Sequence, residues 1–303
     1  MPELPEVQTI TNGLNKRLTG LKITDLWSDV PKIIKNSSLE NFKKEIIGKK
    51  VLDAERRGKN ILMHLSGGIT ILFHMKMTGH LLYGKWVKKD VQICEDDKKY
   101  FWKPTTQGPL CDPYNRFIHF IFYFSNGKEL AFSDARKFGK ILLLKTKEEM
   151  ISNDLKKLGP DALDKNFTFK RFKETLAKKS DGFIKQILLD QEVIAGIGNI
   201  YSDEILWSAG IHPKEKLSKL KDGHKKNIFN AMKRILKASV KLGGDSMSDF
   251  RNLDGEKGKY QEHHKTYRRI GEPCPKVGCK GKIIRIKVAS RSAHFCETHQ
   301  KLF

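Results

Sequence analysis

The first seven residues of the chain combine a candidate nucleophile with two carboxylates. Removal of Met1, which the small Pro2 permits, turns the Pro2 nitrogen into a free secondary amine. Such an amine attacks an electrophilic carbon and forms an iminium, which is nucleophilic catalysis of the Schiff-base kind. An α-amino group has a pKa of about 8, so roughly a tenth of it is neutral at pH 7. Glu3 and Glu6 lie within one helical turn and can move protons around such a centre.

The plainer interpretation of the same stretch is a helix start. Proline is preferred in the first turn of a helix, and acidic side chains there complement the helix dipole. The apolar residues that follow are spaced by 3, 3 and 4, which predicts one buried helix face. They are Leu4, Val7, Ile10 and Leu14.

Length and charge point to a large protein with a polyanionic partner. The chain has 303 residues, enough for two or more domains that each bury a core. Its 58 Lys and Arg against 35 Asp and Glu give a net charge of +23, which favours nucleic acid over the alternative of a generally basic surface. The sequence has neither a run of 18 apolar residues nor an apolar signal region. We therefore expect a cytoplasmic protein.

Cysteines near the carboxyl end predict a metal site. Cys274 and Cys279 are followed, after sixteen residues, by Cys296 and His299. Three thiolates and an imidazole suit one structural Zn²⁺ with no open position, and the odd total of five cysteines argues against a disulfide framework. The alternative is four unrelated residues. Between the two pairs the alternation predicts a hairpin with Arg291 at its tip, a device that reaches DNA.

The rest of the chain changes from strand-like to helical patterns. Apolar runs predict antiparallel strands, as in a sandwich or barrel, at residues 61–65, 69–73, 117–124, 129–132 and 141–144. From about residue 150 the spacing is helical, at 169–178, 181–191, 200–209 and 225–241. Gly196 and Gly198 precede one of these helices and can hold a phosphate on backbone N–H groups, with Asn199 expected as the helix cap.

Residues 85–115 fit neither pattern, and we interpret them as an insertion. They mix Lys, Asp, Pro and single aromatic residues, and they include Cys94 and Cys111. Three interpretations stay open for these cysteines: they meet, they bind a second metal with His119, or they are inert.

Several short motifs together resemble the formamidopyrimidine-DNA glycosylase family, which is shared with endonuclease VIII. In chain order they are residues 2–7 (PELPEV), 56–59 (RRGK), 74–79 (HMKMTG), 134–139 (DARKFG), 196–201 (GIGNIY) and 271–274 (GEPC). The resemblance implies an α+β multidomain fold. Its parts are an N-terminal β-sandwich with flanking helices at 1–150, a helix–two-turn–helix domain at 151–262 and a zinc finger at 263–303.

The function that the resemblance implies is bifunctional base-excision repair of double-stranded DNA. Such a monomeric enzyme removes oxidised purines, 8-oxoguanine and formamidopyrimidines, and then cleaves the strand by β,δ-elimination. Carried over to this sequence, Pro2 is the nucleophile and Glu3 the proton-transfer carboxylate. Lys59 pairs with phosphate near the reacting sugar. Neither a redox cofactor nor a catalytic metal is implied.

The resemblance also implies which residues bind DNA. They are Met77, Arg136, Phe138, Lys185, Asn199 and Arg291. The first three match residues that fill the void left by an extruded nucleotide, and the last two match phosphate clamps. Lys185 matches a phosphate- or lesion-side lysine, with a solvated helix lysine as the alternative. Residues 243–246 and 255–258 flank a loop that is expected to close over an extruded purine.

Departures from the family keep rival functions open. The first cysteine pair is lengthened, the last ligand is His299 rather than cysteine, and Ala135 stands where proline is usual. Leu4 favours the purine-lesion branch over endonuclease VIII. The rivals are the same chemistry on oxidised pyrimidines, a catalytically silent lesion-binding protein, and a structural zinc-ribbon protein of an RNA assembly.

Overall fold

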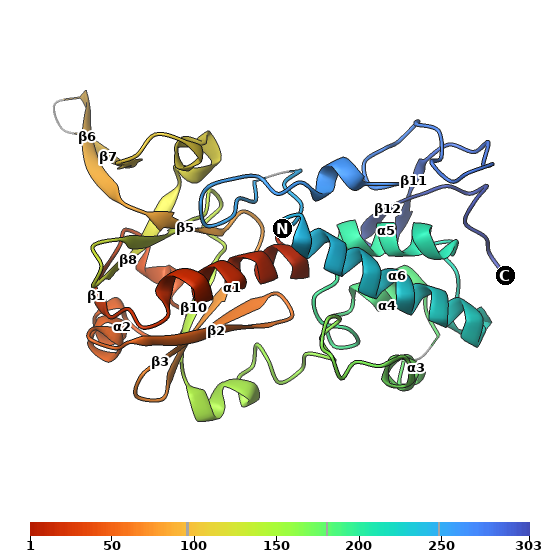
Figure 1. The fold of residues 1–303 in the computed structure, drawn as a ribbon, viewed down its shortest axis with the longest axis horizontal. Helices are drawn as coiled ribbons and strands as arrows, with labels where there is room; N and C mark the ends of the chain where they lie inside the picture. Colours follow the sequence, from red (N-terminus) through yellow and green to blue (C-terminus); the bar gives the residue numbers. More distant parts are fainter. Residues whose placement is uncertain (95–96, 180, 248) are drawn as a thin grey trace. The chain divides into compact units, whose positions relative to one another are not determined.

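The computed structural model describes residues 1–94, 97–179, 181–247 and 249–303. They form two compact units, Met1–Ser152 with Gly243–Lys259 and Asn153–Leu242 with Tyr260–Phe303 (Figure 1). The segment Gly243–Lys259 therefore belongs to the same unit as the amino terminus, although it follows the helical half in sequence. None of the described helices is long and apolar enough to cross a membrane.

The first unit is a sandwich of two four-stranded antiparallel sheets. The strand orders are β1-β8-β9-β5 and β10-β4-β3-β2. The strands are β1 (Ile23–Ser28), β2 (Val51–Arg57), β3 (Asn60–Leu65), β4 (Ile69–His74), β5 (His80–Gly84), β8 (Ile118–Phe124), β9 (Glu129–Ser133) and β10 (Lys140–Lys145). The predicted sandwich is confirmed, and β3, β4, β8, β9 and β10 match the five predicted runs.

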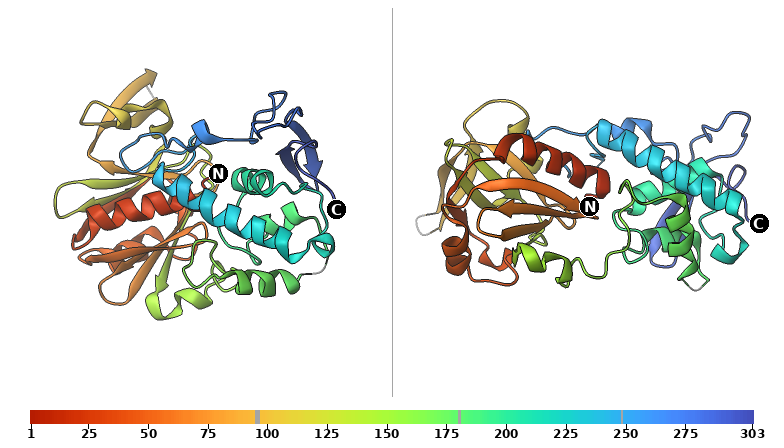
Figure 2. Two further views of the ribbon diagram at one scale, coloured as in Figure 1. Left: turned by 45° about the vertical axis from the view of Figure 1, so that its right-hand side comes forward. Right: turned by 60° about the horizontal axis from the view of Figure 1, so that its bottom comes forward.

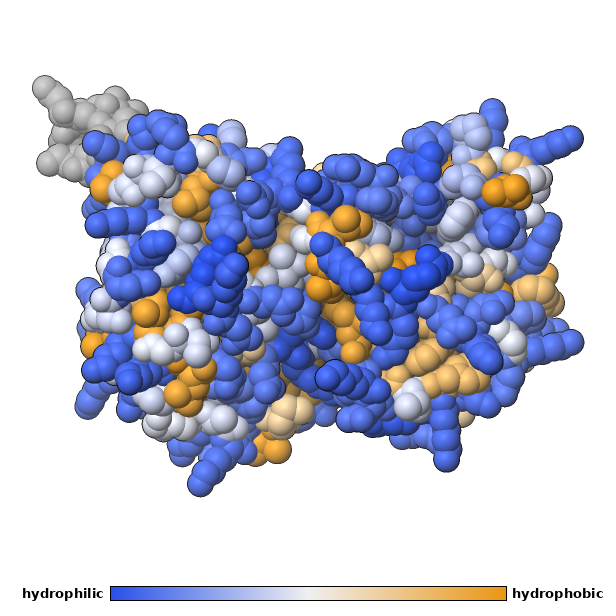
Figure 3. Space-filling view, viewed as in Figure 1, coloured by the Kyte–Doolittle hydropathy of each residue, from blue (hydrophilic) through white to orange (hydrophobic). Residues whose placement is uncertain are grey.

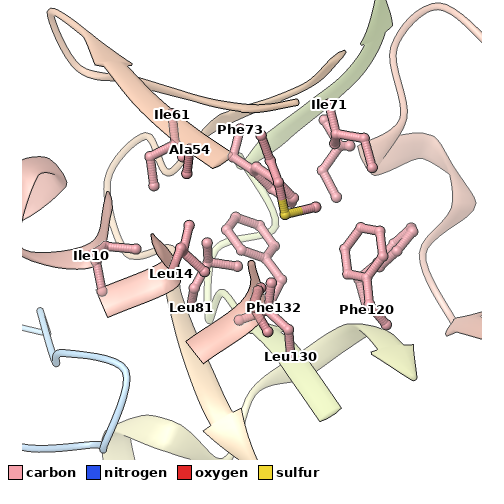
Figure 4. Packing of buried hydrophobic residues seen from close by; sticks show 14 of the residues in the cluster. Ile10, Leu14, Ala54, Ile61, Ile71, Phe73, Leu81, Phe120, Leu130 and Phe132 are labelled. Atoms are coloured by element: carbon pink, nitrogen blue, oxygen red, sulfur yellow. The ribbon is translucent and has the colours of Figure 1, made fainter. Parts of the chain in front are cut away.

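Apolar side chains of the two sheets meet in one core (Figure 4). Phe73 of β4 points toward the opposite sheet, where its ring centroid lies 5.8 Å from that of Phe122. The helix α1 (Leu4–Leu18) adds Ile10 and Leu14 to this core, which confirms the buried face predicted from their spacing. Burial of a side chain of this size contributes about 1.5–3 kcal/mol. The core thus fixes α1 against the sandwich, and the start of α1 with it.

A second helix of this unit, α2 (Leu39–Ile46), begins at a serine cap. The hydroxyl of Ser38 accepts a hydrogen bond from the N–H of Asn41 at 3.2 Å. Its buried Phe42 lies edge-on to Phe120, with ring centroids 6.0 Å apart. This helix therefore anchors the chain between β1 and β2 in the same core.

The insertion at 85–115 forms a hairpin and a return segment. β6 (Trp86–Cys94) pairs with β7 (Asp97–Pro104), and two 3₁₀ turns follow at Pro109–Cys111 and Pro113–Asn115. Figure 2 shows the hairpin extending from the sandwich. Its base covers the outer face of the first sheet, where Trp102 packs edge-on against Trp27 at 4.9 Å. The insertion thus buries a second, smaller core.

The proposed second metal site gains no support from the described residues. Cys111 is exposed, and the side chain of Cys94 lies outside the described part of the structure. Nδ1 of His119 lies 3.0 Å from a carboxylate oxygen of Asp29.

The second unit packs helices against a carboxyl-terminal hairpin. Its elements are α3 (Phe169–Ala177), α4 (Ile184–Leu189), α5 (Asn199–Ala209), α6 (Asp222–Lys241), β11 (Ile284–Val288) and β12 (Arg291–Phe295). α5 contacts both α6 and β12, and the Tyr201 hydroxyl lies 2.6 Å from that of Ser239. The predicted helical half and the predicted hairpin are both confirmed. Hydrophilic residues cover most of the face in Figure 3, which agrees with the high content of charged residues, 31% of the chain.

His64 on β3 is held between two carboxylates. Its Nδ1 lies 2.6 Å from Asp53 Oδ1 and its Nε2 lies 3.1 Å from Glu149 Oε2. Burial opposes the charged ring, but the hydrogen bonds and charges of Asp53 and Glu149 outweigh it and raise the pKa of His64 above 6.5. A raised pKa in the folded state stabilises the protein below the unfolded-state pKa. This stabilisation is lost as the pH rises through the folded-state pKa.

We expect His64→Gln to lower the urea midpoint of unfolding more at pH 6 than at pH 9. Glutamine cannot carry the charge that both carboxylates attract. Urea titrations of both proteins at the two pH values measure the difference, with exposed His263→Gln as a control. An equal loss at both pH values would show that His64 stabilises by packing alone.

Candidate active site and DNA interface

The residues after Met1 are buried, and Glu6 braces them. Pro2 and Glu3 are buried just before α1, while Met1 is exposed. One carboxylate oxygen of Glu6 accepts the N–H of Glu3 at 2.8 Å, and the other accepts the N–H of Asp245 at 2.7 Å. Glu6 is 2% exposed, so both bonds are shielded from water. The arrangement gives Glu6 a bracing role and leaves Glu3 as the carboxylate next to Pro2.

Lys59 lies at the same end of the sandwich as the start of α1. The two-residue turn Gly58–Lys59 joins β2 to β3, and Gly58 has φ +58°. Asn15 bonds to Ala54 at 2.7 Å, and Gln8 bonds to Arg56 at 2.7 Å. α1 is therefore antiparallel to β2, and its first residues lie near the end of β2 that leads into the turn.

Met77, Arg136 and Phe138 lie on two neighbouring turns that cross between the sheets. Residues 75–79 lead from β4 to β5, and 134–139 lead from β9 to β10. The partner strands pair at these ends, with His80 opposite Ser133 and Lys140 opposite His74, so the turns are adjacent.

The three side chains on these turns are exposed at their tips. Met77 is 42% and Phe138 is 53% exposed, and the Arg136 guanidinium lies over the Phe138 ring at 4.6 Å. Because Asn60 of β3 also pairs with His74, the turn that holds Lys59 opens at this same end. The structure thus brings together the candidate residues of the first unit.

Three of the four predicted metal ligands form a cluster in the second unit. The sulfur atoms of Cys274, Cys279 and Cys296 lie within 4.8 Å of one another. The Gly281 N–H donates to the Cys279 sulfur at 3.4 Å, and this bond lowers the pKa of the Cys279 thiol. A Cβ at Gly281 would lie 2.7 Å from the Cys296 sulfur, so only glycine fits there. The donor set is compatible with a metal ion.

His299 lies outside this group of three ligand atoms, but its hydrogen bonding leaves one ring nitrogen able to bind a metal. Its Nε2 lies 2.9 Å from the carbonyl oxygen of Trp207 and donates to it, which leaves the lone pair on Nδ1. Metal-binding histidines usually donate their second nitrogen in this way. Burial lowers the pKa of His299 and favours the neutral ring. Its role as the fourth ligand stays a prediction.

Asn199 lies beside the hairpin tip that carries Arg291. The Asn199 amide nitrogen is 3.5 Å from the hydroxyl of Ser292, and Arg291 is exposed at the start of β12. The predicted cap is wrong: Gly198 is the N-cap of α5 and Asn199 is its first helical residue. The Asn199 amide is therefore directed to the hairpin rather than to its own helix.

Lys185 is buried in an ion pair. Its ammonium bonds to the Asp203 carboxylate and lies 3.3 Å from the Ser202 hydroxyl, with the Lys185 side chain 0% exposed. Asp203 also accepts the backbone N–H of His294 in β12 at 2.9 Å. The alternative of a solvated helix lysine is wrong, and the phosphate-contact role stays a prediction.

Two further carboxylates act in this geometry but were not identified from the sequence. Asp203 joins α4 to β12, as described, and Glu204 accepts the N–H groups of Lys265, Thr266 and Tyr267 at 2.9–3.1 Å. Both lie in the second turn of α5, after Asn199. The sequence signal that could have identified them is a pair of acidic residues among the apolar residues of α5.

Comparison with known proteins shows similarity to one enzyme family along the whole chain. The formamidopyrimidine-DNA glycosylase N-terminal domain matches residues 1–141, and the H2TH domain of that enzyme matches residues 158–251. The formamidopyrimidine-DNA glycosylase of Pelotomaculum thermopropionicum is 38% identical over 302 residues and covers 100% of both chains. That of Desulforamulus reducens is 36% identical and covers 99% of both. The chain belongs to the formamidopyrimidine-DNA glycosylase family. It is a DNA glycosylase of base excision repair.

Solved structures of the family agree with this assignment. The Lactococcus lactis enzyme in complex with DNA that contains an abasic site has a TM-score of 0.82 at 32% identity, and 99% of each chain is covered. A complex of MutM with DNA that contains carbocyclic 8-oxo-G has a TM-score of 0.81 at 32% identity, with 99% of this chain covered. The predicted family, fold class and enzyme class are therefore confirmed.

Gly244→Ala should disturb the start of α1 in this glycosylase through Glu6, which Gly244 contacts across a long separation in sequence. Gly244 has φ +84°, and a Cβ there would lie 2.9 Å from a Glu6 carboxylate oxygen. We expect about a tenfold or greater loss of strand cleavage, because a small misplacement of reacting groups is costly. Gly223→Ala is the control, since a Cβ there meets nothing within 4 Å. Equal activity of the two variants would show that Glu6 does not position the amino terminus.

Proposed function

We propose that this glycosylase is bifunctional and uses the Pro2 amine as its nucleophile. The observation that carries the proposal is the family match along the chain, together with a buried Pro2 beside Glu3. After Met1 is removed, the neutral amine attacks C1′ of the damaged nucleoside. The N-glycosidic bond breaks, and the base leaves with its electron pair and takes up a proton.

The chemistry of strand cleavage then follows from the iminium. Glu3 gives a proton to the ring oxygen as the C1′–O4′ bond opens and the iminium forms. The iminium acidifies the C2′ proton, so its removal expels the 3′ phosphate by β-elimination. A second elimination expels the 5′ phosphate. Lys59 pairs with a phosphate at this site, and the product is a one-nucleoside gap with phosphate at both ends.

The DNA partner is held by residues of both units. We assign void filling to Met77, Arg136 and Phe138, because an exposed apolar wedge and a cation can replace the stacking and pairing of an extruded nucleotide. We assign phosphate contacts to Asn199 and Arg291. Lys185 then acts through Asp203 and His294, which fix the hairpin that carries Arg291. We further propose that the enzyme acts in the cytoplasm, as a monomer.

We propose purine lesions as the substrate class. The MutM complex with an 8-oxo-G analogue and a Lactococcus lactis complex with Fapy-dG support this choice, and so does Leu4 at the fourth position. The alternative is an endonuclease VIII-like preference for oxidised pyrimidines.

The three-thiol cluster is proposed to hold one structural Zn²⁺, with His299 as fourth ligand. Three thiolates and one imidazole make the tetrahedral ligand set that suits zinc. Four protein ligands leave no open position for catalysis. The metal would connect the end of the hairpin that carries Arg291 to the preceding segment that carries Cys274 and Cys279.

Borohydride trapping tests the nucleophile and the lesion class together. We expect wild-type protein to form a covalent band with a duplex that contains 8-oxoguanine opposite cytosine, and the adduct to map to the amino-terminal peptide. Pro2→Gly should lose the band by at least about a hundredfold, since the secondary amine is gone. Mass spectrometry of the free protein verifies that Met1 is absent.

The other outcomes separate the rivals. A band with thymine glycol but none with 8-oxoguanine would move the enzyme to the oxidised-pyrimidine class. Lesion-enhanced binding with no band on either substrate would leave a silent lesion-binding protein.

Metal analysis tests the zinc proposal. We expect one zinc per chain, and loss of that zinc in Cys279→Ala because the tetrahedral set is broken. His299→Ala should bind zinc more weakly, whereas exposed Cys111→Ala is the matched control and should keep it. Full zinc content in His299→Ala would exclude the imidazole as a ligand.

A further inference from the structure

A buried carboxylate lies beneath the exposed side chains of the two crossing turns. Asp134 directly follows β9 and is 0% exposed. Its Oδ2 accepts the Gly139 N–H at 2.7 Å, and its Oδ1 accepts the Thr78 hydroxyl. Its backbone N–H bonds to the Phe117 carbonyl at 2.8 Å, so the residue itself is fixed to the sheet. One side chain thus joins both turns.

Thr78 completes the connection between the turns. While its hydroxyl donates to Asp134, the same oxygen accepts the backbone N–H of Arg136 at 3.1 Å. Thr78 is the neighbour of Met77, and Arg136 stands two residues after Asp134. The positions of Met77 and Arg136 are therefore coupled through two hydrogen bonds at one hydroxyl.

The close packing under the turns leaves little room for other conformations. A Cβ at Gly139 would lie 2.4 Å from the Phe132 ring, and one at Gly79 would lie 2.4 Å from the Met75 carbonyl. Lys76 and Lys137, one on each turn, have φ +53° and +56°. Such conformations persist in residues other than glycine only where the surroundings impose them. The buried bonds to Asp134 supply that constraint.

The network continues behind the first turn into the insertion. His80 is buried, with Nδ1 at 3.2 Å from the Thr78 carbonyl and Nε2 at 3.0 Å from Asn115 Oδ1. The Asn115 amide nitrogen in turn donates to the Pro109 carbonyl at 2.9 Å. Thr78 therefore lies between Asp134 and His80, and His80 in turn lies beside Asn115 of the return segment.

We propose that Asp134 and Thr78 are positioning residues that hold Met77 and Arg136 in one fixed arrangement for filling the void in duplex DNA. The inference rests on the proposed void-filling function and deepens it. Neither residue reaches the reacting atoms. Their effect is confined to substrates in which an opposite strand leaves a void to be filled.

Single-turnover cleavage of two substrates tests the pair. The substrates are a duplex with 8-oxoguanine opposite cytosine and a single-stranded oligonucleotide with an abasic site. We expect Thr78→Val and Asp134→Asn each to slow duplex cleavage by about tenfold or more, because misplaced binding groups are costly. Cleavage of the single strand should stay within about threefold of wild type, since the chemistry at Pro2 is unchanged.

A double variant and a matched control sharpen the test. The double variant Thr78→Val, Asp134→Asn should lose no more of its duplex cleavage rate than the worse of the two single variants, because both residues act through the same hydrogen bond. Thr70→Val removes another buried hydroxyl of this unit, whose partners are Thr146 and Glu149. It should leave the ratio of duplex to single-strand cleavage unchanged. If Asp134→Asn fails to fold, the Thr78→Val ratio alone decides.

Three results would overturn the inference. The first is an equal loss on both substrates, which would indicate general destabilisation. The second is additive losses in the double variant, and the third is described below for Thr78→Val. Met77→Ala and Arg136→Ala are measured in parallel. If these keep wild-type duplex cleavage, the void-filling function itself fails. If they lose it while Thr78→Val keeps it, only the positioning role fails.

Discussion

The carboxylate of Glu6 is the contact on which the reactive end of the chain depends. A buried charge is tolerated only when it is hydrogen-bonded, and both oxygens of Glu6 accept backbone N–H groups, from Glu3 and Asp245. The start of α1 cannot move without leaving that charge unsatisfied. Asp245 belongs to the segment Gly243–Lys259, which is part of the first unit. The helix start and the proposed nucleophile are therefore compatible in one structure, so the two interpretations of the first seven residues do not exclude each other.

The sandwich topology explains why the proposed catalytic and DNA-binding residues of the first unit share one end of it. A strand that leaves one sheet for the other must cross at an end of the sandwich, and two such crossings lie side by side at 75–79 and 134–139. The β2–β3 turn with Lys59 and the start of α1 open at that end. The insertion at 85–115 leaves this arrangement intact because it covers the outer face of a sheet with Trp86 and Trp102.

Sequence patterns predicted β3, β4, β8, β9 and β10 of the sandwich and missed β1, β2 and β5, the last although it is buried from His80 to Tyr83. β1 and β2 are buried only at about every third residue, and each has an irregular register near its start, at Ile23 and at Val51. Period-2 alternation therefore does not mark them. The site residues followed from motifs, but their partners did not, because the bond between Glu6 and Asp245 spans 239 positions. Lys185 shows the same limit, since nothing local indicates that Asp203 neutralises it in the interior.

Both units hold exposed DNA-directed side chains on buried acidic residues, and this division of labour has a physical reason. An exposed arginine or methionine gains little free energy from any one conformation in water, so its position must come from the backbone beneath it. Asp134 fixes the backbone under Arg136, and Asp203 fixes β12, which begins with Arg291. In each case a buried carboxylate accepts a backbone N–H of the segment that carries the exposed side chain. Preorganisation of the DNA-binding surface thus follows from the cost of burying a charge without partners.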